Sequence, residues 1–110
     1  HEVFRYIGYK YGETPADMPR RSEQATLIVK HKGFDPNIMN MSGNSLLYEL
    51  SMFRFNNKYY KPIIEIIFKK YPNVVVSTEL ITELIASGNT DILQLYKKYK
   101  KIPKSLKSLV

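Results

Sequence analysis

Two turn signals at a fixed spacing, followed by a helix start, constrain the fold of this chain more than any other feature. Residues 33–37 read Gly-Phe-Asp-Pro-Asn, residues 43–48 read Gly-Asn-Ser-Leu-Leu-Tyr, and a related turn, Tyr-Pro-Asn-Val, stands at residues 71–74. Glycine, proline and asparagine favour tight turns, and a serine before leucines is typical of a helix N-terminus. A turn with two helices that recurs after about 33 to 40 residues is typical of a helical repeat. The spacing therefore predicts a solenoid.

Apolar residues at spacings of three and four predict the helices between these turns. The first begins near Ser22, whose hydroxyl can cap it, and runs to Lys32, with Gly33 as its stop. The later helices are expected to begin at Asn44 or Ser45, at Pro62, at Ser77 or Thr78, and at Thr90, with the last ending at Pro103.

Three segments carry weaker patterns. Residues 3–11 mix helical and alternating spacing, and we favour a helix. Residues 12–19 hold two prolines and a glycine and predict a loop. The valines at 74–76 suit a strand, but their position after a Pro-Asn turn favours an extended finger. We therefore expect an all-α chain of three helix pairs separated by two finger loops.

The pattern resembles the ankyrin repeat, whose unit is a finger, a helix, a short turn and a second helix. Residues 33–37 are similar to the family's Gly-Ala-Asp-Pro-Asn, and residues 43–48 to its Gly-Asn-Thr-Pro-Leu-His. Residues 63–70 resemble the second-helix pattern, and residues 88–95 resemble Gly-His-Leu-Glu-Ile-Val-Lys-Leu. The resemblance implies an ankyrin-like solenoid of about three repeats, degenerate at both ends, in one domain spanning 1–110.

Its expected parts are a degenerate first repeat or cap at 1–32, a middle repeat at 33–70, a last repeat at 71–103 and a basic tail at 104–110. The chain departs from the family at Leu46, Tyr48 and Tyr71, which replace proline, histidine and glycine, and in an insertion between the helices at 54–61. Each helix pair is too small to bury its apolar stripe alone, so stacking on a neighbour is required by physics as well.

The composition offers little to catalysis. The chain has no cysteine, which removes thiolate metal sites and cysteine nucleophiles, and its second histidine, His31, lies between lysines near a helix end. The acidic residues stand apart on helix faces without the spacing of metal ligands or of a carboxylate pair, and there is no glycine-rich phosphate loop. We expect a non-enzyme with no cofactor and no metal.

The resemblance implies a protein-binding surface made of the finger tips and the inner face of the first helices. Two methionines and an isoleucine in a solvent-facing turn suit partner contact, although they could tuck against a neighbouring finger. Leu46, Leu47, Leu50 and Ser51 are expected to face the stack. The expected finger contacts are Ile38, Met39, Asn40 and Met41, joined by Glu49, Met52 and Phe53 on the concave side, of which Phe53 could equally be core.

The insertion places aromatic residues beside lysines, a mixture that suits interface anchors or stacking on nucleic-acid bases, although the rings could instead cover the end of the helix pair. Its expected partner-binding residues are Phe55, Tyr59 and Tyr60.

The net charge of +7 is concentrated near the C-terminus, which suggests a second function. The lysines there could bind nucleic acid or another polyanion, or they could serve solubility and complement a helix dipole. They are Lys97, Lys98, Lys100, Lys101, Lys104 and Lys107. The leading expectation remains a module that binds a partner protein in a cytoplasm, its own or a host's, with the polyanion site and a structural segment of a longer array as alternatives.

Overall fold

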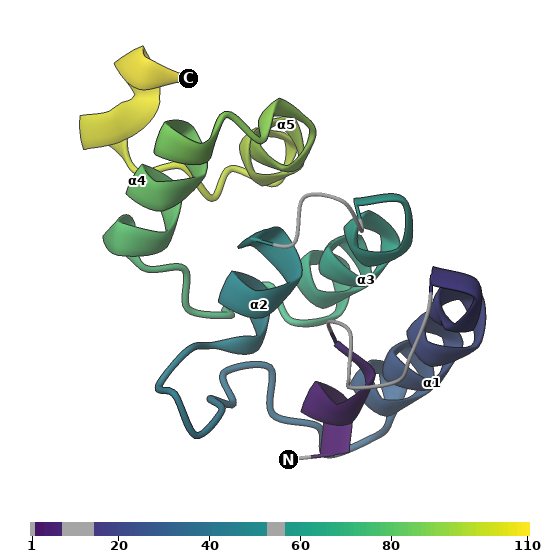
Figure 1. Ribbon diagram of the computed structural model, residues 1–110. Helices are drawn as coiled ribbons and strands as arrows, with labels where there is room; N and C mark the ends of the chain where they lie inside the picture. Colours follow the sequence, from purple (N-terminus) through teal and green to yellow (C-terminus); the bar gives the residue numbers. More distant parts are fainter. Residues whose placement is uncertain (1, 8–14, 53–56) are drawn as a thin grey trace. The chain divides into compact units, whose positions relative to one another are not determined.

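The computed structural model describes residues 2–7, 15–52 and 57–110, and these residues form two compact units, His1–Val74 and Val75–Val110. Both units are helical, which confirms the expected all-α class (Figure 1). Apart from one isolated bridge, the described ranges contain no β-structure, so the valines at 74–76 form no strand. Each unit is described below by itself.

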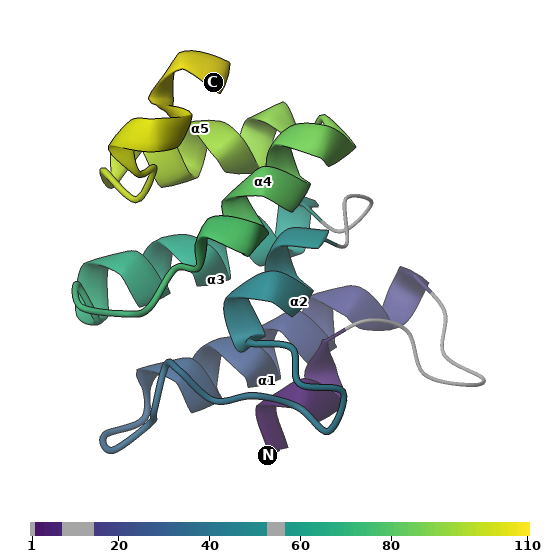
Figure 2. The same cartoon turned by 90° about the vertical axis from the view of Figure 1, so that its left-hand side faces the viewer.

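The first unit is built around the contact between two long helices, α1 (Met18–Lys30) and α3 (Asn57–Lys70) (Figure 2). The shorter α2 (Leu46–Met52) packs against α3, while the 3-10 turns η1 (Glu2–Tyr6) and η2 (Pro15–Asp17) pack against α1. Facing apolar stripes form its core, which includes Met18, Ala25, Val29, Leu46, Leu47, Leu50, Tyr60, Ile63, Ile64 and Ile67. The burial of Leu46, Leu47, Leu50 and Ser51 confirms the predicted buried face of α2.

A loop of residues 31–45, here called the finger, joins α1 to α2. Gly33 and Gly43 adopt φ of 89° and 79°, a region that residues with a Cβ rarely occupy. Met39 and Ser45 form an antiparallel bridge, and the Leu46 amide donates to the Ile38 carbonyl at 3.2 Å. The Ser45 hydroxyl accepts from the Tyr48 amide at 3.1 Å, so Ser45 rather than Asn44 caps α2. The predicted turn-rich finger is therefore confirmed.

Side chains from the end of α3 complete the last turn of α1. The Tyr71 hydroxyl donates to the Val29 carbonyl at 2.7 Å, and the Lys70 ammonium donates to the Lys30 carbonyl. The Tyr71 ring also lies against Phe34, with ring centroids 6.0 Å apart. Because the last carbonyls of a helix lack intrahelical donors, these bonds satisfy groups that α1 cannot satisfy itself. Tyr71, a departure from the ankyrin pattern, thus joins α3 to α1.

The second unit pairs α4 (Thr78–Ser87) with α5 (Thr90–Lys98), and the 3-10 helix η4 (Lys104–Leu109) packs against α4. The Ser77 hydroxyl accepts from the Leu80 amide at 3.1 Å, which confirms the predicted cap. Gly88 turns the chain between the two helices with φ of 71°. The core of this unit contains Leu80, Ile81, Leu84, Ile92, Leu93, Leu95, Tyr96 and Ile102.

Two predicted helix starts are wrong. The first helix begins at Met18 rather than near Ser22, because Pro19 lies in the first turn, where its missing amide hydrogen would have no partner. The Ser22 hydroxyl donates to the Pro19 carbonyl instead of capping. The helix predicted from Pro62 begins at Asn57, with Pro62 inside it.

The early start of α3 follows from Tyr60. A proline inside a helix costs about 3 kcal/mol, and complete burial of a large side chain contributes a similar amount. Tyr60 is 0% exposed, and the helical turn before Pro62 is what carries it into the core. Residues 104–109, predicted as part of a basic tail, form η4. Of the helix favoured over 3–11, residues 3–6 lie in a described helical segment, the 3-10 turn η1.

Candidate binding site at the finger

The finger is held in shape by the side chain of Asn40. Its Oδ1 accepts from the backbone amides of Ser42 at 3.0 Å and Asn44 at 2.9 Å. The backbone of Asn40 adds a bond to the Asn44 carbonyl at 2.9 Å and one from the Gly43 amide at 3.0 Å. These bonds close the tip of the finger into a tight turn, as asparagine commonly does.

Glu49 ties this turn to α2. One carboxylate oxygen, Oε1, accepts from the side-chain amides of Asn40 at 2.8 Å and Asn44 at 3.0 Å. Hydrogen bonds to an ionised acceptor are stronger than neutral ones, and Glu49 is half-buried, so water weakens them only in part. Glu49, predicted as a partner contact, therefore also fixes the finger on its helix.

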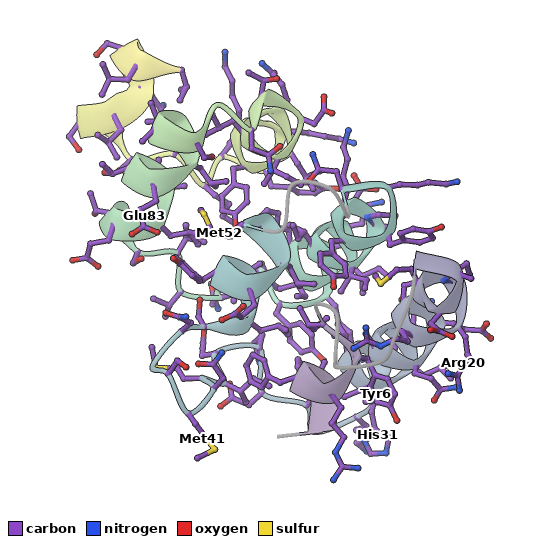
Figure 3. The ribbon with its side chains drawn as sticks, viewed as in Figure 1. Tyr6, Arg20, His31, Met41, Met52 and Glu83 are labelled. Atoms are coloured by element: carbon purple, nitrogen blue, oxygen red, sulfur yellow. The ribbon has the colours of Figure 1, made fainter. Side chains whose placement is uncertain are left out.

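The rigid turn exposes two methionines. Met39 is 62% exposed and Met41 is fully exposed, and Figure 3 shows Met41 at the outer end of the finger, directed away from the helices. Neither side chain tucks into the fold, although large apolar groups favour burial. Because the backbone beneath them is fixed, these side chains can meet a partner surface without first ordering the loop.

A cleft of about 530 Å³ lies beside the finger and belongs wholly to the first unit. The finger, α2 and η1 contribute its walls, with Phe4 and Ile7 from and just after η1 facing the same space as the methionines. Its lining residues are Phe4, Arg5, Ile7, Met39, Asn40, Met41, Ser42 and Glu49. Four apolar and four polar residues line it, and recognition sites commonly combine apolar side chains with a few polar groups that fix orientation.

The other predicted contacts are not brought to this cleft. Ile38, Met52 and Tyr59 are half-buried and lie outside its lining. Tyr60 is completely buried, so the prediction that it contacts a partner is wrong, and the alternative that an insertion ring covers the helix pair holds for it. Phe53 and Phe55 lie outside the described residues.

The sequence missed Phe4, Arg5, Ile7 and Ser42. Phe4, Arg5 and Ile7 belong to a segment without a clear repeat pattern. The spacing of three between Phe4 and Ile7 is the signal that could have placed these two apolar residues on the same side of a helical turn. Their meeting with the finger depends on packing between segments distant in sequence, which periodicity does not report.

The predicted polyanion site lies in the second unit. Lys97, Lys98, Lys100, Lys104 and Lys107 are exposed, and Lys101 is half-buried. They extend from the last turn of α5 to η4, and no acidic residue follows Asp91 in the sequence. The lysines in the last turn of α5 complement its dipole.

The described parts of the chain contain no group of three or more His, Cys, Asp or Glu side chains able to hold a metal ion. In those same parts, every helix is too short or too polar to cross a lipid bilayer. Comparison with known proteins finds no matching family model, no matching curated protein and no matching solved structure.

Proposed function

We propose that this chain is a non-enzymatic protein-interaction module that binds a partner protein through the finger and its cleft. The observation that carries the proposal is the exposure of Met39 and Met41 on a turn held rigid by Asn40 and Glu49. Rigid display lowers the entropy lost on binding, and methionine adapts to irregular apolar surfaces.

An ankyrin-like solenoid is the architecture that we propose for this module. The pairs α2 with α3 and α4 with α5 support it, as does the packing of η1 against α1 in the position of a shortened first pair. In such a solenoid, α1 and α3 would be the second helices of successive repeats. Their packing against each other also supports the proposed architecture, because successive repeats stack through equivalent helices. The position of the finger, between α1 and α2, also supports the proposal.

The double variant Met39→Asp with Met41→Asp tests the binding site. A partner is captured from lysate with the wild-type chain, purified, and titrated against each variant. Burying a methionine side chain contributes about 1.5–3 kcal/mol, so loss of both should weaken binding about a hundredfold or more. Val75→Asp, which charges another exposed apolar residue, 67% exposed in the second unit, is the matched control and should bind as the wild type does.

Unchanged affinity of the double variant, with an unchanged circular dichroism spectrum, would remove the finger from the binding site. Met41 is fully exposed and Met39 is 62% exposed, so little packing is lost in the charged variant, which is expected to fold.

Nucleic-acid or polyanion binding through the lysines of the second unit is the alternative, favoured by their exposure and by the lack of acids after Asp91. Capture would then fail after nuclease treatment, would fall steeply with salt, and would be lost when Lys97, Lys98, Lys100 and Lys101 become glutamine.

A structural role in a longer repeat array is the third candidate. A second cleft of about 500 Å³ runs along α1 and the start of the finger, and it includes Leu27, 57% exposed, beside Ile28 and Phe34. A neighbouring helix pair would cover such a face. The cytoplasmic location expected from the sequence stays a prediction.

A further inference from the structure

Three arginines gather where η1 meets α1. Arg5, Arg20 and Arg21 line a pocket of about 150 Å³ together with Tyr6 and Gln24. Figure 3 shows Tyr6 and Arg20 on the same side of the first unit, one from η1 and one from α1. A volume of this size suits one small group.

Arg21 is built into the fold. It is only 3% exposed, and its Nη2 donates to the Arg5 carbonyl at 2.6 Å, which holds η1 against the helix that carries Arg21. Arg5 and Arg20 are exposed beside it. One guanidinium is therefore held in place while two others are free to turn toward a ligand, which lowers the ordering needed for binding.

The local charge calls for an anion. Among the described residues that line the pocket none is acidic, and Asp17, which precedes α1, is not part of the lining. Arg20 and Arg21 lie in the first turns of α1, whose N-terminal end carries the positive end of the helix dipole and no acidic residue in its first turn. Cations at this end are unfavourable to the dipole, which Asp17 at the N-cap of α1 offsets in part, and an anion in the pocket would add to that compensation.

We propose that this pocket binds a phosphoryl group, and that the group is carried by a phosphorylated side chain of a protein partner. Guanidinium groups bind phosphate oxygens through paired hydrogen bonds, and clusters of arginine are a common solution for phosphorylated segments. The protein source follows from Arg5, which lines both this pocket and the finger cleft. A partner segment with an apolar side chain against the methionines thus passes beside the arginines, a step that rests on the proposed function.

The test titrates ¹⁵N-labelled chain with O-phosphoserine, inorganic phosphate, serine and acetate, and follows the backbone amides by NMR. Saturable shifts are expected at residues 5, 6, 20, 21 and 24 with both phosphoryl compounds, and none that saturate with serine or acetate. Arg5→Gln and Arg20→Gln should each weaken the binding of O-phosphoserine by about tenfold. Lys32→Gln, which removes one exposed positive charge elsewhere in the first unit, should leave it unchanged.

Three results would overturn the proposal: acetate binding as tightly as O-phosphoserine, shifts of equal size at the lysines of 97–107, or wild-type affinity in Arg20→Gln. Binding of inorganic phosphate without binding of O-phosphoserine would also overturn it, since the pocket would then hold an adventitious ion only. The double variant at Met39 and Met41 should bind O-phosphoserine as the wild type does. A failure of the proposed finger site would therefore appear in partner binding, and a failure of the proposed phosphoryl pocket would appear in the O-phosphoserine titration.

Discussion

Removal of the Glu49 carboxylate should loosen the finger while leaving the helices in place. In Glu49→Ala, the side-chain amides of Asn40 and Asn44 lose the oxygen that accepts from both, at 2.8 and 3.0 Å. A hydrogen bond to an ionised acceptor contributes about 1.5–3 kcal/mol when buried, and Glu49 is half-buried, so we take about 1 kcal/mol for each bond. The sum, about 2 kcal/mol, corresponds to about a thirtyfold increase in the population of the open finger.

Amide hydrogen exchange measures this opening directly. The amides of Asn40 and Leu46, which donate to the Asn44 and Ile38 carbonyls across the finger, should exchange about thirtyfold faster in Glu49→Ala. The amide of Leu93, in the second unit, is the internal reference and should not change. Glu49→Gln is the matched control, because its amide oxygen still accepts and only the charge is lost, so an acceleration of about fivefold is expected.

Two outcomes would refute the reasoning. Unchanged exchange at Asn40 and Leu46 in Glu49→Ala would show that the carboxylate does not hold the finger. An equal acceleration throughout α2 and α3 would show that Glu49 stabilises the whole first unit instead.

Five further substitutions, at four positions, test the stability of single features, all by urea unfolding of the intact chain. Tyr71→Phe removes the bond to the Val29 carbonyl but keeps the ring, and should destabilise by about 1 kcal/mol; no loss would show that water replaces the hydroxyl. Ser77→Ala removes the N-terminal cap of α4 and should also destabilise the chain by about 1 kcal/mol, and an unchanged unfolding midpoint would show that this cap does not contribute to stability. Gly88 has φ of 71°, and a Cβ added there would meet no atom within 4 Å, so Gly88→Ala should lower the free energy of unfolding by about 1–2 kcal/mol through backbone conformation alone. Gly88→Asn should lower it less, because asparagine tolerates this conformation, and an equal loss in both variants would contradict this cause. Lys100 has φ of 57°, so Lys100→Asn should stabilise by a few tenths of a kcal/mol, and destabilisation would refute the assigned strain.

Local chemistry made the finger predictable. Turn residues such as Gly33 and Gly43, and the cap Ser45, act within a few positions of themselves, so the sequence locates them well. The buried face of α2 follows from the same local periodicity.

The parts that the sequence did not predict depend on contacts between distant segments. The start of α3 lies before a proline because Tyr60 is buried in a core made by other helices. One wall of the finger cleft and one wall of the arginine pocket come from η1, which is held to α1 by a bond between Arg21 and the backbone of Arg5. Neither the spacing nor the composition of residues 2–7 indicates which distant segments of the chain they contact.

The bonds that complete the last turn of α1 have a consequence for synthesis. Lys70 and Tyr71 follow their carbonyl partners by 40 and 42 residues, so a chain made from its N-terminus exposes the unfinished end of α1 until the whole of α3 has been released. The first unit should therefore gain its final stability late and in one step, when α3 docks. A ribosome-bound chain that ends before residue 70 should remain sensitive to proteases in α1. A longer chain, in which residues 1–74 have all left the ribosome, should resist cleavage there.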